Sequence, residues 1–275
     1  MTTPLIFCSP HSGRDYPVSF LERSRLPSNL IRRSEDLFID DLYHFVTDLG
    51  APMIAAQFPR AFLDVNREPY ELDPAMFDGP LPDYVNTRSI RVAGGLGTIP
   101  KIVAENTEIY RGPMSVEEGL ERIDTYHGSF HAALADLIAE TKRVHGVAIL
   151  IDCHSMPSNV KPAVGTRRSN IIIGDRYGTS AAARLVSFVT SSFSRAGYDV
   201  MRNKPYAGGY ITQRYGRPAI GEHVLQVEIS RALYSEEMEF KKSGDFSKVA
   251  RDLKMIFSWV SQKVRETYPS SIAAE

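Results

Sequence analysis

The sequence predicts an α/β fold of three layers, αβα, with a mostly parallel or mixed central sheet. Two kinds of segment support this prediction. Short runs of aliphatic and β-branched residues, at 147–151 and 170–175, are typical of strands buried on both faces. Segments with apolar residues at every third or fourth position, at 115–145 and 180–196, are typical of amphipathic helices. Strands that alternate with helices indicate a sheet between two helix layers.

The composition indicates an ordinary globular protein. The chain has 275 residues, of which 43% are hydrophobic and 24% charged, and its net charge is −1. This balance argues against nucleic-acid and membrane partners. The first residues lack the features of a signal peptide, and two cysteines indicate reduced thiols, so we expect a cytoplasmic protein. No boundary stands out, and we expect residues 1–275 to form a single domain.

The run Val147–Ser155 is the most informative stretch. Five aliphatic residues lead into Asp152-Cys153-His154-Ser155. In open α/β sheets, reactive groups lie just past the carboxyl ends of the strands. Asp152 and His154 are two residues apart and should point to one side, with Cys153 on the other. We therefore expect a base or a metal ligand here.

The N-terminus repeats this pattern. Leu5–Cys8 is a short apolar run that predicts a strand, and Ser9-Pro10-His11-Ser12 follows it. Two such strand ends side by side would bring His11 and His154 to one metal ion.

Residues 34–49 are predicted to form a helix that ends at Gly50. Asp36 and Asp40 would share one face of it, opposite the apolar stripe. Helix geometry alone favours a solvated acidic face for them.

Residues 62–67 alternate apolar and polar side chains and predict a strand, which carries Asn66 and Arg67 at its exit. Arg60 lies just upstream. Guanidinium groups match carboxylates bidentately, so these residues are candidates for substrate recognition. A surface ion pair is the alternative. The long Gly- and Pro-rich segment 69–115 that follows is a candidate active-site wall.

His127 and His131 lie one turn apart on the predicted helix 115–145. Such a pair can bind a metal, but no acid stands between them as in His-Glu-x-x-His. We favour hydrogen-bonded core histidines.

The last third contains a predicted loop, strand and helix. Residues 206–212 form a glycine-rich loop with Tyr210, a candidate lid. Residues 224–230 predict a strand in which Glu228 stands among aliphatic neighbours, which is costly unless the glutamate is paired or functional. Residues 238–267 predict the closing helix.

His11, His154 and Glu228 together indicate metal-assisted hydrolysis. Zinc takes nitrogen and oxygen ligands and lowers the pKa of bound water. A nearby carboxylate can accept the proton of that water and pass it to the leaving amine.

The sequence resembles the N-formylglutamate amidohydrolases. The resemblance extends over nearly the whole chain, in the segments Pro10–Gly13, Asp36–Tyr43, Asp64–Arg67, Gly94–Pro100, Asp152–Ser155, Gly208–Tyr210 and Leu225–Glu228. It implies hydrolysis of N-formyl-L-glutamate to glutamate and formate, in histidine degradation or in a related amide-clearing role. The family in turn is similar to the zinc carboxypeptidases, which implies a zinc-exopeptidase-like (phosphorylase/hydrolase-like) fold.

The resemblance also implies roles for individual residues. His11 and His154 would bind zinc or another divalent transition metal, and Glu228 would be the catalytic base. The substrate would be bound by Asn66, Arg67, Arg60 and Tyr210.

The position of the carboxypeptidase glutamate ligand is Arg14 here, so the third ligand must come from elsewhere. We choose Asp36, then Asp40, then Asp15.

Other readings stay open at this point. A zinc carboxypeptidase or a deacylase would use the same groups on other N-acyl amino acids. A carboxylate-binding protein without catalysis could share the fold. Cys8 and Cys153 are expected to be packed thiols that point away from the histidines. The substrate would be a small molecule, and the sequence does not indicate the oligomeric state.

Overall fold

The computed structural model describes residues 1–160 and 169–268. The chain divides into two compact units that interleave in sequence. The first comprises Met1–Ser9, Asp36–Ile54 and Ala135–Glu275, and the second comprises Pro10–Glu35 and Ala55–Leu134. That residues 1–275 act as a single domain stays a prediction.

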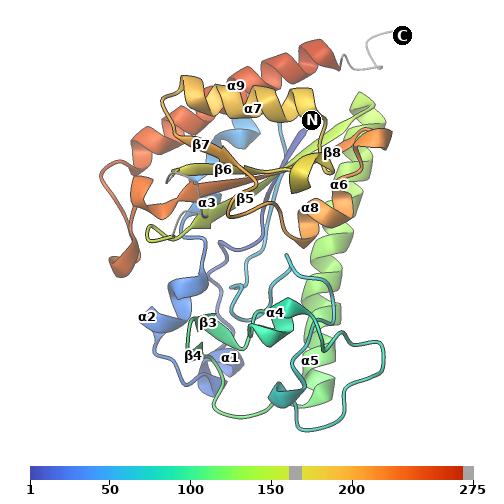
Figure 1. Cartoon of the computed structure of the whole chain (residues 1–275), viewed down its shortest axis with the longest axis vertical. Coiled ribbons are helices and arrows are strands. Elements are labelled where there is room, and N and C mark those ends of the chain that lie inside the picture. The colour runs from blue at the N-terminus through green and yellow to red at the C-terminus, as the bar shows by residue number, and fades with distance from the viewer. Residues whose placement is uncertain (161–168, 269–275) are drawn as a thin grey trace. The chain divides into compact units, whose positions relative to one another are not determined.

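A six-stranded sheet forms the centre of the first unit (Figure 1). Its strand order is β2-β1-β5-β8-β6-β7. The strands are β1 (Leu5–Ser9), β2 (Met53–Ala55), β5 (Ala148–Met156), β6 (Ile171–Gly174), β7 (Val200–Arg202) and β8 (Glu222–Ser230). β1, β5 and β8 run parallel, whereas β6 is antiparallel to β8 and parallel to β7. The predicted mostly parallel or mixed sheet is confirmed.

Helices flank this sheet, as expected for an α/β fold. They are α3 (Ile39–Leu42), α6 (Ser129–His145), α7 (Ala183–Arg195), α8 (Tyr210–Tyr215) and α9 (Phe246–Thr267). Figure 1 shows α7 and α9 together over one face, with α8 on the other side of the sheet. Short 3-10 helices occur at His44–Leu49, Arg176–Gly178, Pro218–Ile220, Arg231–Leu233 and Glu237–Glu239, and a two-stranded hairpin is formed by β9 (Ser235–Glu236) and β10 (Lys241–Lys242).

The two faces of the sheet differ in chemistry. Ile149, Ile151 and Cys153 of β5 belong to the hydrophobic core that includes residues of α3, α7 and α9. Successive residues of a strand point to opposite faces, so Asp152 and His154 point away from that core. The polar residues of β5 are therefore gathered on the second face.

The second unit contains short elements connected by turns. They are α1 (Val18–Arg23), α2 (Ser28–Ile31), α4 (Ile90–Ala93), α5 (Val116–Arg122), a β3–β4 hairpin (Ile102–Ala104 and Thr107–Glu108), and 3-10 helices at Arg32–Ser34 and Pro74–Met76. Ser115 caps α5 by accepting a hydrogen bond from the amide of Glu118 (3.1 Å). The helical run continues through a π-helix at Ile123–Gly128 into α6, so the predicted helix 115–145 is confirmed.

Three predicted elements are wrong. The helix at 34–49 is broken, because Phe38 is left-handed (φ 57°), and only α3 and a 3-10 helix form there. The strand at 62–67 is a series of turns, because the Asp64 carboxylate accepts a hydrogen bond from the amide of Asn66 (2.9 Å). The last helix starts at Phe246, because the chain first forms β9, a 3-10 turn and β10.

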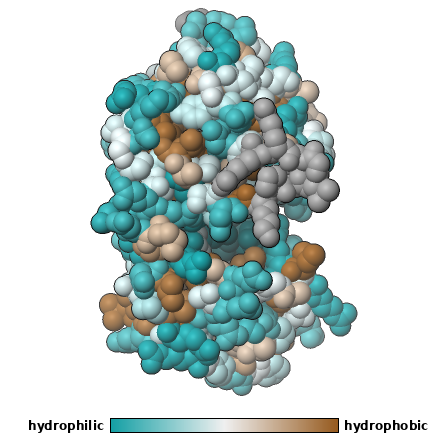
Figure 2. Space-filling model, turned by 60° about the vertical axis from the view of Figure 1, so that its left-hand side comes forward, coloured by the Kyte–Doolittle hydropathy of each residue, from teal (hydrophilic) through white to brown (hydrophobic). Residues whose placement is uncertain are grey.

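The surface has no extended apolar region on the side that Figure 2 shows. Hydrophilic residues cover most of it, and hydrophobic ones appear in small separate groups. Within residues 1–160 and 169–268, no helix combines the length and the apolarity needed to cross a bilayer.

Candidate active site

Four polar side chains form a regular array on β5 and β8. His154 pairs in register with Glu228, and Asp152 pairs with Gln226. All four are at most 6% exposed. Paired residues of parallel strands point to the same face, so these side chains lie side by side. The whole array is therefore contributed by the two central strands of the sheet.

The imidazole of His154 lies between two carboxylates. Its Nδ1 is 2.9 Å from Asp36 Oδ2, and its Nε2 is 3.0 Å from Asp152 Oδ1. Burial by itself lowers the pKa of His154, but Asp152 and Asp36 outweigh it and raise the pKa well above its usual value. The two carboxylates therefore favour the protonated ring, and a metal ion would compete with that proton.

Asp36 is held from its other side by Ser155 and Arg231. The Ser155 hydroxyl donates to Asp36 Oδ1 (3.3 Å), and Arg231 Nη2 lies 3.6 Å from the same oxygen. Asp36 lies before α3, in the turn that ends in the left-handed Phe38, and it is 1% exposed. This turn, and not the continuous helix that we predicted, places the Asp36 carboxylate beside β5.

Arg231 is a buried cation that the sequence did not single out. It follows β8 directly and is 4% exposed. Its Nε donates to Ser155 Oγ (3.0 Å) and its Nη1 to Glu237 Oε1 (3.1 Å). In the sequence, the hint that Arg231 belongs to the site was its position three residues after Glu228, just past the predicted strand.

A second cluster lies in the second unit, around Asp64. Its Oδ1 accepts a hydrogen bond from His11 Nε2 (2.7 Å), and its Oδ2 accepts one from Arg60 Nη2 (2.7 Å). Arg67 Nη2 is 3.6 Å from Oδ2. Burial raises the pKa of Asp64, but Arg67, His11 and Arg60 together hold it well below its usual value. The anionic Asp64 thus orients three of the candidate site residues.

Arg67 is fixed further by the backbone. Its Nε donates to the carbonyl of Leu96 (2.9 Å), and its Nη1 donates to the carbonyl of Asn66 (3.0 Å). The ion pair that was the alternative for Arg67 is present, but its partner Asp64 is buried and not at the surface. Asn66 is buried (3% exposed). These contacts give Arg67 a defined orientation within its unit.

His127 and His131 are core histidines, as predicted. Their Nε2 atoms lie 3.0 Å from the carbonyl of Arg67 and 2.8 Å from that of Val65. Both side chains are buried. The pair therefore supports the backbone of the turn that presents Asn66 and Arg67.

Tyr210 is the first residue of α8 rather than part of a loop. Its hydroxyl accepts a hydrogen bond from Arg214 (2.6 Å), and the ring is half-buried. The glycine-rich segment before it, through Gly209, matches the predicted loop.

Among the described residues, His11, Asp36 and His154 form a buried group that could hold a metal ion. Asp15 is exposed and Asp40 is half-buried, and neither belongs to this group. Two imidazole nitrogens and a carboxylate oxygen form a donor set that suits zinc. Asp64 and Asp152 each approach the second nitrogen of one imidazole, as the outer partners of metal-bound histidines do. The residues therefore fit a divalent transition metal.

Cys8 and Cys153 are both fully buried free thiols, as expected for packed cysteines. Burial, followed by the charge of Asp152, raises the pKa of each well above its usual value. Only Cys153 points away from His154. β1 continues in register through Cys8, which pairs with Asp152 and therefore lies on the same face of the sheet as Asp152 and His154. The prediction that Cys8 points away from the histidines is wrong.

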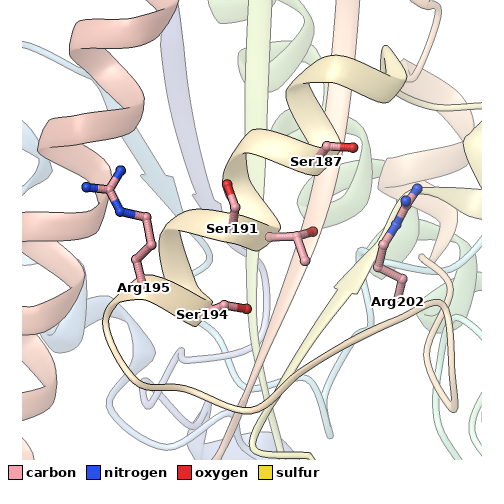
Figure 3. A pocket seen from close by; sticks show the side chains of 6 residues that line it. Ser187, Ser191, Ser194, Arg195 and Arg202 are labelled. Atoms are coloured by element: carbon pink, nitrogen blue, oxygen red, sulfur yellow. The ribbon is translucent and has the colours of Figure 1, made fainter.

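A groove of about 530 Å³ lies on α7, away from this array (Figure 3). It is lined by Ser187, Thr190, Ser191, Ser194, Arg195 and Arg202. Arg202 is already paired with the buried Asp175 (2.7 Å). The lining contains neither a base nor a metal ligand, so the groove is not the candidate active site.

Comparison with known proteins gives consistent results. Residues 3–235 match the family model described as N-formylglutamate amidohydrolase. The N-formylglutamate deformylase of Pseudomonas aeruginosa is 28% identical over 90% of this chain and 88% of its own length. That of Pseudomonas putida is 27% identical over 86% and 83%, respectively.

Solved structures agree with these matches. The crystal structure of N-formylglutamate amidohydrolase from Ralstonia eutropha JMP134 has a TM-score of 0.90 and 32% identity, over 96% of this chain and 95% of that one. The gene product Atu2144 from Agrobacterium tumefaciens, at 18% identity and a TM-score of 0.66 over 96% of this chain and 92% of that one, shares the fold. The chain is thus a hydrolase that acts on an amide bond, and it belongs to the N-formylglutamate amidohydrolase family.

Proposed function

We propose that this chain hydrolyses the amide bond of N-formyl-L-glutamate, or of a closely similar N-acyl amino acid, in a metal-dependent reaction. The names of its relatives support the substrate. The observation that carries the chemistry is the buried donor group of His11, Asp36 and His154, with Glu228 in register beside His154.

The reaction adds water to the formyl carbon and breaks its bond to nitrogen, which yields formate and the free amino acid. A divalent ion held by His11, Asp36 and His154 would polarise the formyl oxygen and lower the pKa of the attacking water. Glu228 accepts the proton of that water and returns it to the amine nitrogen as the bond breaks. Protonation of the nitrogen makes the amine a competent leaving group.

The substrate is anionic, and the second unit supplies cationic and amide groups for it. Arg67 and Asn66 bind the α-carboxylate, and Arg60 binds the side-chain carboxylate. Tyr210 contributes a further hydrogen bond. Asp64 holds the two guanidinium groups in fixed positions, so little conformational entropy is lost when the substrate binds.

A formate-release assay tests the proposal. Purified protein is assayed on N-formyl-L-glutamate and on N-acetyl and other N-formyl amino acids, with zinc and with a chelator. We expect release of formate from N-formyl-L-glutamate that requires the metal, and about one ion per chain by mass spectrometry. His154→Ala should lose both metal and activity, whereas His44→Ala, which changes an exposed histidine, should keep both. Activity that persists in His154→Ala would refute the assignment.

The same assay separates the alternative substrates. A preference for N-acetyl or larger acyl groups would identify a deacylase that uses the same site. The preference has to be measured, because a pocket separates acyl groups that differ by one methylene by only about 1–3 kcal/mol. Roles in histidine degradation and in the cytoplasm stay predictions.

A further inference from the structure

Gln226 of β8 connects Glu228 to the segment that precedes α8. Its Nε2 donates a hydrogen bond to Glu228 Oε1 (2.8 Å). Its Oε1 accepts a hydrogen bond from the amide of Gly209 (2.9 Å). The side chain is 4% exposed and lies on the same face as Glu228, two residues away. The Gln226 carboxamide therefore donates one hydrogen bond and accepts another.

Only an amide satisfies both partners at this position. The N–H of Gly209 needs an acceptor, and the carboxylate of Glu228 needs a donor, which together fix the orientation of the carboxamide. A glutamate would keep the acceptor but would place a second carboxylate against Glu228. A leucine would leave both partners without this bond.

The segment that Gln226 holds is tightly built. A Cβ on Gly174 would lie 2.7 Å from the carbonyl carbon of Ala207, so β6 and this segment touch backbone to backbone. The amide of Arg176 donates to the carbonyl of Ala207 (2.7 Å). Gly208 has φ +120°, a conformation that favours glycine. Gly209 then leads directly into Tyr210, so the hydrogen bond to Gln226 lies one residue before the start of α8.

We propose that Gln226 is a positioning residue, which orients the Glu228 carboxylate for proton transfer and ties it to the 207–210 segment that presents Tyr210. The inference rests on the proposed function, in which Glu228 is the base. A misdirected base slows the chemical step and leaves ground-state binding largely intact. Gln226 therefore acts mainly on kcat.

Two variants separate the two hydrogen bonds. In Gln226→Glu, the acceptor for Gly209 remains and the donor to Glu228 is lost. In Gln226→Leu, both are lost. We measure kcat and KM on N-formyl-L-glutamate, together with hydrogen–deuterium exchange of peptides that cover residues 206–212. Gln213→Leu, an exposed glutamine on α8, is the matched control.

We expect kcat to fall about 10-fold or more in both Gln226 variants, with KM within roughly 3-fold in Gln226→Glu and higher in Gln226→Leu, where the segment that presents Tyr210 is released. Exchange at 206–212 should stay at the wild-type rate in Gln226→Glu and rise in Gln226→Leu. Gln213→Leu should match the wild type in all three quantities. A wild-type kcat in Gln226→Glu, or equal exchange in the two Gln226 variants, would overturn the inference.

Glu228→Gln in the same assay distinguishes the two proposals. If the wild type releases no formate from N-formyl-L-glutamate, the proposed function fails, and the exchange rates of the Gln226 variants still decide whether the link to Gly209 exists. If Glu228→Gln is inactive while both Gln226 variants keep the wild-type kcat, the proposed function stands and the positioning role of Gln226 is refuted.

Discussion

His154 and Glu228 occupy paired positions on β5 and β8, so an imidazole and a carboxylate stand next to each other on one face of the sheet. Their neighbours Asp152 and Gln226 are paired in the same way. Each of these two candidate side chains therefore has a polar residue two positions before it on its own strand. The spacing of the strands, and not the conformation of a loop, sets the distance between the two groups.

Metal should stabilise the folded protein measurably. An ion that binds only the folded chain adds RT ln(1 + [L]/Kd), which is about 4 kcal/mol at a concentration of 1,000 Kd. We expect the Tm to rise when zinc is added to chelator-treated protein. Asp36→Ala should abolish the rise, whereas Asp41→Asn, which removes a neighbouring surface acid paired with Lys242, should keep it. A Tm that does not depend on zinc would contradict the metal assignment.

Asp64→Asn should weaken metal binding without removing a ligand. The carboxylate holds Nε2 of His11, and loss of such an outer partner typically reduces metal affinity 10–100-fold. The variant also removes the anion between Arg60 and Arg67, so KM should rise. Competition with a chromophoric chelator measures the affinity independently of turnover. An unchanged affinity would show that Asp64 serves only the arginines.

Arg231→Met should destabilise the first unit strongly. The substitution removes the guanidinium that lies between the buried Asp36 and the half-buried Glu237, and breaking a buried ion pair costs about 3–5 kcal/mol. Arg231→Lys should recover part of this loss because it restores the charge but not the fork of donors. Urea unfolding measures the difference, with the exposed Arg251→Met as control. A loss below about 1 kcal/mol would show that Arg231 contributes little.

Asp252 gives a prediction for the pH dependence of stability. Burial raises its pKa, but hydrogen bonds from Lys248 (2.8 Å) and Tyr198 (2.7 Å) outweigh this and lower the pKa below 3.8. A lowered folded-state pKa contributes stability above the unfolded value, and this contribution is lost as the pH falls through the folded value. Asp252→Asn should therefore lower the Tm at pH 7 by at most about 2–4 °C, because a partly exposed ion pair contributes no more than about 1 kcal/mol. The difference from wild type should shrink below roughly pH 4. A difference that is constant between pH 7 and pH 3 would contradict the prediction.

The cysteines should be unreactive in the native protein. Cys8 and Cys153 are both 0% exposed. We expect intact-mass analysis to find no alkylation by iodoacetamide under native conditions and two adducts in denaturant. Rapid labelling of the native chain would show that the strands open frequently.

Local sequence patterns correctly predicted the position of β5 and the direction of its side chains. The aliphatic run before Asp152 predicted β5, and the two-residue period placed Asp152 and His154 on one face. Patterns failed where a single backbone conformation decides the outcome. The left-handed Phe38 interrupts an otherwise good helix, and the Asx turn at Asp64 replaces a strand.

Long-range partners could not be read from spacing. Asp36 and His154 are 118 positions apart, and Arg231 and Ser155 are 76 apart. Their contacts depend on which strands become neighbours, and a single sequence does not show that order. The resemblance to a family supplied Asp36 where helix geometry had favoured a surface acid.

The alternation along β5 has an evolutionary consequence. Ile151 and Cys153 contribute to the hydrophobic core, whereas Asp152 and His154 belong to the polar array. Adjacent residues of β5 thus serve different surroundings, one the hydrophobic core and the next the polar array. A relative could acquire a new substrate by exchanging only every second residue of β5 and β8, while the other half of each strand kept the fold intact.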